Sequence, residues 1–189
     1  MRTLRIALVM ALLLFAEFVP LQAQEGAALE RGEVIIEDVT APDGVPGLRV
    51  SFLVEASREA IWSVLVDYEN FTRVFRGVDR LKVLEEDGHG ARVEFWVDAV
   101  LKDLHYVLYR EYVEPGRRLT WRRVSGDLKR IHGSWEILDT DDPDRQLLVY
   151  ESYVDIGFYP LTWLIREGAM DRAEKMAQRL RDWLARPRL

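Results

Sequence analysis

The sequence predicts a single α+β domain in which a curved antiparallel β-sheet wraps around a long C-terminal α-helix, with two short helices after the first strands. Two observations lead to this prediction. From Val34 onward, segments of alternating apolar residues are separated by turn residues, and the gaps after Val78 are too short for crossover helices, so the strands are antiparallel. From about Leu161 the apolar period lengthens from two to about 3.6 residues, which is typical of an amphipathic helix.

Residues 1–23 have the layout of a secretory signal peptide. Arg2 and Arg5 precede an apolar run, residues 6–16, that is shorter than the roughly 20 residues a membrane crossing needs. We expect cleavage after Ala23, and therefore a periplasmic or secreted protein. The alternatives are an uncleaved interfacial anchor and a buried core helix. Because the chain has no Cys, it is not a lipoprotein.

Residues 24–32 are expected to form a flexible lead-in, and residues 33–186 a single domain. The domain begins with a predicted hairpin. Residues 34–39 are rich in β-branched side chains, and residues 48–55 alternate between apolar and polar side chains. Between them, residues 41–47 contain two Pro and two Gly, which is the chemistry of a turn.

Two short helices are expected after this hairpin. Ser57 can cap a helix that runs to about Val66, because the apolar residues there recur at helical spacing. Asp67 can cap a second helix over residues 70–75, and Gly77 is expected to end it.

The remaining chain is predicted to be strands and then one helix. The strands are expected at residues 78–86, 91–101, 104–113, 119–124, 131–138 and 146–154. The C-terminal helix follows Pro160, where a helix can begin, and stops before Pro187. Its wide apolar stripe has to lie on the concave face of the sheet to be buried.

Composition excludes several classes of protein. With 49% hydrophobic and 31% charged residues the chain is not disordered, and a formal net charge of −6 gives no reason to expect nucleic acid as a partner. Phosphate-binding glycine loops, metal-ligand spacings and nucleophile motifs are absent from the sequence, so we predict no metal, no cofactor and no catalytic residue. His132 and Glu136 share one face of a strand. We expect that face to point outward, because Trp135 on the opposite face suits the core better.

The order of the predicted elements is that of the helix-grip fold, and two segments carry a resemblance to a known family. Residues 54–71, VEASREAIWSVLVDYENF, resemble the opening motif of the START-like (SRPBCC) superfamily, in particular its polyketide cyclase/dehydrase and coenzyme Q-binding START-type branch. Residues 119–137, LTWRRVSGDLKRIHGSWEI, are similar to a later strand pair of the same branch. The resemblance extends over about residues 48–185.

The resemblance implies a cavity between the sheet and the long helix that holds a hydrophobic small molecule such as a lipid, a quinone or a polyketide-like compound. A carrier or sequestering role is the first hypothesis, with transient membrane contact. The second is a cyclase or dehydratase acting in the same cavity, and the third is an envelope interaction module without a ligand. From the residues alone, a completely packed interior is an equal alternative to a cavity. The sequence does not determine the oligomeric state.

Candidate ligand-contacting residues are those expected on the inner faces of the strands, on the second short helix and on the buried stripe of the long helix. They are Phe75, Phe95, Val97, Tyr106, Leu108, Trp121, Arg123, Trp135, Met170 and Ala173. Arg123 is included because it shares a strand face with Trp121, so an inward Trp121 implies an inward guanidinium that could hold a polar head group. The other charged residues on strands, Arg110 among them, are expected on the exposed convex face.

Overall fold

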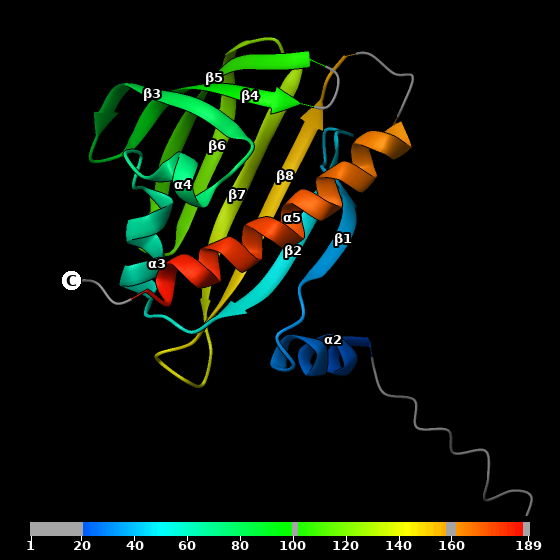
Figure 1. The fold of residues 1–189 in the computed structure, drawn as a ribbon, viewed down its shortest axis with the longest axis vertical. Coiled ribbons are helices and arrows are strands. Elements are labelled where there is room, and N and C mark those ends of the chain that lie inside the picture. Colours follow the sequence, from blue (N-terminus) through cyan, green and yellow to red (C-terminus); the bar gives the residue numbers. More distant parts are fainter. Residues whose placement is uncertain (1–20, 100–101, 158–161, 187–189) are drawn as a thin grey trace, which may run out of the picture.

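The computed structural model describes residues 21–99, 102–157 and 162–186. Its strands form one antiparallel eight-stranded sheet in the order β1-β2-β8-β7-β6-β5-β4-β3, and α5 runs across the concave face of that sheet (Figure 1). In chain order the elements are α2 (Leu21–Glu30), β1 (Ile35–Thr40), β2 (Pro46–Val54), α3 (Arg58–Leu65), α4 (Phe71–Val74), β3 (Val78–Asp87), β4 (Gly90–Ala99), β5 (Lys102–Glu114), β6 (Arg118–Gly126), β7 (Arg130–Asp139), β8 (Gln146–Asp155) and α5 (Thr162–Leu184). The predicted fold class is confirmed.

The sheet is built from hairpins, with one long-range pairing. Strands that follow one another pair directly from β3 to β8, as their short connections require. The exception is the pairing of β2 with β8, where Val50 lies opposite Tyr150. This pairing joins the N-terminal hairpin to the last strand, so the sheet stays open with β1 and β3 at its edges.

The two short helices cover one end of the concave face. The hydroxyl of Ser57 accepts a hydrogen bond from the backbone N–H of Ala60, so Ser57 caps α3 as predicted. Asp67 caps the turn before α4, where its carboxylate accepts hydrogen bonds from the backbone and the side-chain amide of Asn70. Gly77 follows α4 with a φ of 106°, a conformation that favours glycine.

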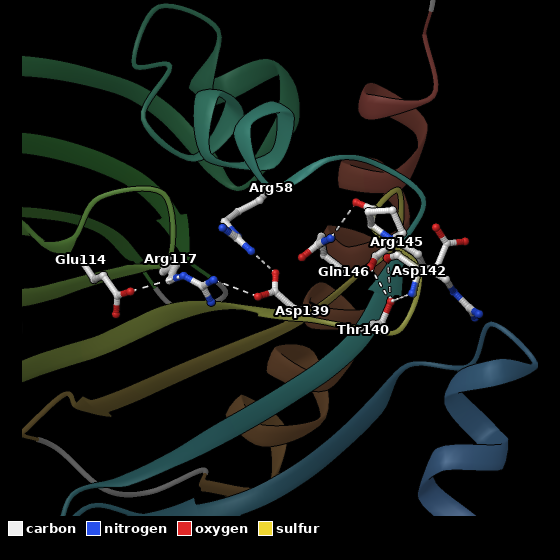
Figure 2. A network of polar contacts seen from close by, with 9 residues as sticks. Arg58, Glu114, Arg117, Asp139, Thr140, Asp142, Arg145 and Gln146 are labelled. Atoms are coloured by element: carbon white, nitrogen blue, oxygen red, sulfur yellow. Dashed lines mark hydrogen bonds and ion pairs between the residues drawn. The ribbon is translucent and has the colours of Figure 1, made fainter.

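Ion pairs connect the start of α3 to the end of the sheet (Figure 2). Arg58 donates to Asp139 at the end of β7, and Asp139 also accepts from Arg117 Nη2 at 2.8 Å. Arg117 Nε lies 3.4 Å from Glu114 Oε1, which extends the chain of charges across the β5–β6 turn. The hydrogen bond from Arg58, and then that from Arg117, lowers the pKa of Asp139 below its ordinary value.

The N-terminal region differs from the prediction. Residues 24–32 were expected to be a flexible lead-in, but most of them belong to α2. Gln24, Glu25, Ala27, Ala28 and Leu29 are good helix formers, and this local preference explains the helix. Residues 1–20, most of the predicted signal peptide, lie outside the described residues. Of the helices that the structure describes, none has the length and apolar character needed to span a membrane.

Candidate ligand-binding interior

The concave face of the sheet is apolar and rich in aromatic side chains. The period of two places Val93 and Phe95 of β4, Leu108 of β5, Trp121 of β6 and Trp135 of β7 on this face, and all are buried. The long helix α5 turns the buried side chains Ala173, Ala177 and Leu180 toward the same core. Small alanines on the helix leave room for the large rings on the sheet.

Aromatic rings from the sheet and from α4 pack against one another in this interior. Phe71 of α4 lies 5.8 Å from Phe95, measured between ring centroids, in an edge-to-face arrangement. Trp135 lies 6.2 Å from Phe75 and 4.6 Å from Tyr150. The middle of the interior is therefore filled largely by the protein's own side chains.

The structure brings most of the predicted ligand-contacting residues together. Those buried in the core are Phe75, Phe95, Leu108, Trp121, Trp135 and Ala173. Val97 and Tyr106 are half-buried and pack against this core. Met170 is half-buried on α5. That these residues contact a ligand stays a prediction.

Arg123 lies on β6 opposite Leu108, one of these core residues. It is half-buried at the end of β6, where its Nη2 donates to the carbonyl of Gly126 at 2.7 Å. The pairing of β5 with β6 is irregular here: Val107 pairs with Ser125, whereas Leu108 pairs with Arg123. The irregularity begins after Arg123, so the alternation between Trp121 and Arg123 is kept, and Arg123 lies on the same strand face as Leu108. That its guanidinium contacts a ligand stays a prediction.

Arg110 lies in the interior, whereas the sequence predicted an exposed position for it. It lies on β5 opposite Trp121, and only 3% of its surface is exposed. The signal was available, because Leu104, Leu108 and Tyr112 share one strand face and Arg110 falls on that face. Its charge favoured an exposed position instead.

Two phenols add polar groups to the concave face. Tyr106 and Tyr150 point inward, and burial raises the pKa of both phenols above the ordinary value for tyrosine. Both side chains therefore stay protonated at neutral pH and can donate hydrogen bonds. Tyr106 also stacks on Phe95, with ring centroids 5.7 Å apart.

The histidines lie outside this interior. His89 is in an exposed turn, and His105 pairs at the surface with Glu94 at 2.7 Å. His132 stacks on Tyr153 of the neighbouring strand, with ring centroids 5.0 Å apart. Among the described residues, no three potential metal ligands gather closely enough to hold an ion.

Two hollows in the described part of the chain open to the surface. One, of about 410 Å³, lies between α2, the end of β2 and the C-terminal turn of α5, and its lining includes Arg145 and Arg181. The other, of about 430 Å³, lies at the junction of β6 and β7 and is lined mainly by cations, including Arg122 and Arg130. Neither is enclosed between the concave face and α5.

The fold is shared with solved structures of START-like proteins. The STAR-related lipid transfer protein from Xanthomonas axonopodis superimposes with a TM-score of 0.67 at 15% identity, over 81% of this chain and 94% of that one. A START superfamily protein from Mycobacterium smegmatis gives a TM-score of 0.64 at 16% identity, over 73% and 96%. The Zhui aromatase/cyclase from a Streptomyces species gives a TM-score of 0.53 at 19% identity, over 80% of this chain and 87% of that one. At these identities the matches establish the fold.

The family follows from the sequence itself. Residues 54–181 match the model of the polyketide cyclase/dehydrase and lipid transport family, and the chain belongs to this family within the START-like superfamily. A search of curated proteins finds no significant match. The predicted superfamily is thereby confirmed, whereas membership of the coenzyme Q-binding branch stays a prediction. Because polyketide chemistry and lipid transport both handle apolar molecules, the family suggests a domain that binds a hydrophobic ligand.

Proposed function

We propose that the protein is exported and binds a hydrophobic small molecule, such as a lipid, a quinone or a polyketide-like compound, which it carries or sequesters. The observation that carries the proposal is the concave face, whose inward side chains from β2 across to β4 are mostly apolar or aromatic, with the buried Arg110 among them. The family description, which includes lipid transport, supports the same function. Burial of an apolar molecule against such a face is favourable because it removes apolar surface from water.

Partly exposed side chains on the concave face give a ligand a surface to cover. Val97, Leu104, Tyr106, Tyr150 and Val154 pack against the core but are only half-buried. A face filled completely by its own side chains would leave them buried. Contact with these side chains therefore supplies part of the binding energy.

Entry of the ligand requires movement of α4. This helix has four residues, and its Phe71 and Phe75 lie among the core side chains, 4.4 Å apart between ring centroids. A helix of one turn has little stability of its own, so outward displacement of these two rings costs less than movement of a strand. We propose that residues 71–77 form the rim through which the ligand passes, with transient contact to a membrane.

A carrier role fits the interior better than catalysis. A cyclase or dehydratase needs a group that accepts a proton beside the ligand. The fully buried charged side chains in the described residues are Arg110 and Asp155, and Asp155 is paired with Arg130 at the end of β8. The phenols of Tyr106 and Tyr150 can donate hydrogen bonds but stay protonated.

A role as a surface interaction module has less support. Such a module needs a large exposed apolar patch. In the described part of the chain the exposed large hydrophobic residues are Leu84, Val113, Val124 and Leu138, and each lies on a different strand.

Native mass spectrometry and organic extraction of the protein purified from the periplasm test the proposal. We expect a co-purifying apolar compound. The variant Ala173→Met fills part of the interior and is expected to lower the bound fraction, whereas Glu174→Met, at the exposed neighbouring position, serves as the matched control. A folded protein that carries no compound and takes up none from a lipid extract would contradict the proposal.

Export is tested separately by the intact mass of the secreted protein. Cleavage after Ala23 predicts a mature chain that begins at Gln24. Retention of residues 1–23 would contradict cleavage, and a protein confined to the cytoplasm would contradict export. Either result would leave ligand binding intact.

A further inference from the structure

Arg110 presents an unusual combination of burial and charge. Its surface is 97% covered, and its guanidinium is held by one hydrogen bond, from Nη2 to the carbonyl of Leu65 at 3.1 Å. Nη1 is buried as well and has no hydrogen-bond partner. Arginine keeps its charge in proteins, so a full positive charge lies inside the domain with one of its donors unused.

Among the side chains that the structure describes, no carboxylate forms an ion pair with Arg110. Arg49 provides the contrast, because it pairs with Glu151 at 2.7 Å on the exposed side of the sheet. The surroundings of Arg110 stabilise its positive charge only in part. Its Cζ lies 5.1 Å from the ring centroid of Tyr68 and 5.2 Å from that of Phe71, and the Leu65 carbonyl is at the C-terminus of α3.

The position of the charge fits one end of an elongated ligand. Arg110 lies beside Trp121, and Trp121 stacks on Tyr150 with ring centroids 5.5 Å apart. Tyr150 in turn packs on Trp135. The guanidinium therefore lies at one side of an aromatic surface that reaches across β6 and β7 to β8, and the Tyr150 phenol on that surface is a second donor.

We propose that the ligand is an amphipathic acid, whose oxyacid head group pairs with Arg110 Nη1 while its apolar body lies against Trp121, Trp135 and Tyr150. The inference rests on the proposed function and adds the chemical class of the ligand. A buried cation without a carboxylate partner is costly, and an anionic head group removes that cost when it binds. An uncharged lipid of the same shape would leave the charge uncompensated, so the site discriminates between the two.

Titration calorimetry on the delipidated full chain tests this with three probes of one chain length: laurate, lauryl alcohol and lauryl phosphate. We expect the wild type to bind an acid at least about tenfold more tightly than the alcohol. Preference for laurate would identify a carboxylate head group, and preference for lauryl phosphate a phosphate ester. Both results support the proposal, because both head groups are oxyacids.

The variant Arg110→Met keeps an unbranched stem and removes the charge. It is expected to lose about tenfold or more in affinity for the acid and to bind the alcohol within about threefold of the wild type. Arg122→Met is the matched control, because Arg122 is an exposed residue on the adjacent strand that stacks on Tyr109, and it is expected to change neither affinity. Arg110→Lys retains a cation and is expected to keep part of the preference for the acid.

The outcomes separate the two proposals. Equal affinity of the wild type for acid and alcohol, or a preference that survives in Arg110→Met, would overturn the acid assignment and leave hydrophobic-ligand binding in place. Failure of all three probes to bind, in a protein without a co-purifying apolar compound, would overturn the proposed function itself. If Arg110→Met does not fold, the wild-type comparison and Arg110→Lys still decide the question.

Discussion

The indole of Trp121 occupies the space that a side chain at residue 133 would need. Gly133 pairs with Trp121 across β6 and β7, and a Cβ atom added at Gly133 would lie 2.8 Å from Cε2 of the indole and would collide with the carbonyl of Glu151. The glycine therefore allows a large ring to lie flat against the strand, and this ring is part of the surface proposed to bind the ligand.

Gly133→Ala is expected to lower the free energy of unfolding by about 1–3 kcal/mol, because backbone or a buried indole has to move. Urea unfolding followed by tryptophan fluorescence measures the change. The control is Gly88→Ala in the β3–β4 turn, where an added Cβ meets nothing within 4 Å. Equal stability of the two variants would show that Trp121 is not confined by Gly133.

Asp139→Asn is expected to remove a pH-dependent contribution to the stability of the fold. The pKa of Asp139 is lowered by the hydrogen bonds from Arg58 and Arg117, so the carboxylate stabilises the fold above its ordinary pKa and loses this effect as the pH falls through the lowered value. Thermal midpoints of the wild type and the variant should differ by a few degrees at about pH 7 and converge at about pH 2. Asp141→Asn, at an exposed position nearby, is the control. A constant difference at all pH values would contradict the role of the charge.

Tyr106→Phe is expected to reduce the loss of folding stability at high pH. The raised pKa of Tyr106 means that the unfolded chain loses this proton first, so stability is unchanged below about pH 10 and falls above it, by at most roughly 1.4 kcal/mol per pH unit for this one phenol. The free energy of unfolding of the variant, relative to that of the wild type, should be higher at about pH 11 than at about pH 8. Tyr109→Phe, on the opposite face of the same strand, is the control.

Arg181→Met is expected to cost about 1–3 kcal/mol of stability, because two carbonyl groups lose their donor. Arg181 Nε donates to Leu53 at 2.8 Å, and its Nη1 donates to Gly32 at 2.9 Å, so the residue joins α5 to β2 and to the segment after α2. Lys175→Met is the control, since the pair of Lys175 with Asp171 is exposed. Similar losses in both variants would rule out a special role for Arg181.

Most of the architecture could be predicted from the sequence because local patterns specify it. Alternation predicted the strand now seen as β6, and the change of period predicted α5. The Ser57 cap is likewise a local signal that the structure confirms. The ends of strands were less predictable: β2 begins at Pro46, inside the expected turn.

The interior could be predicted less well because it depends on contacts between distant segments. The carbonyl that receives the Arg110 hydrogen bond belongs to Leu65, 45 residues earlier in the chain, and no local pattern reveals it. The hydrogen bond from Arg123 to the carbonyl of Gly126 forms beside a bulge in the β5–β6 pairing that the periodicity does not show. Strand alternation predicts the face on which a side chain lies, but the partners on that face come from the tertiary fold.

The open sheet has a consequence for solubility. An edge strand exposes unpaired backbone groups that can recruit a strand from another molecule. At one edge, β3 interrupts its register with β4 at two places and carries exposed charges, including Asp79, Lys82 and Glu85, which oppose such pairing. At the other edge, β1 has only six residues. Both edges of the open sheet thus carry features that oppose strand pairing with another molecule, and they do so without closure into a barrel.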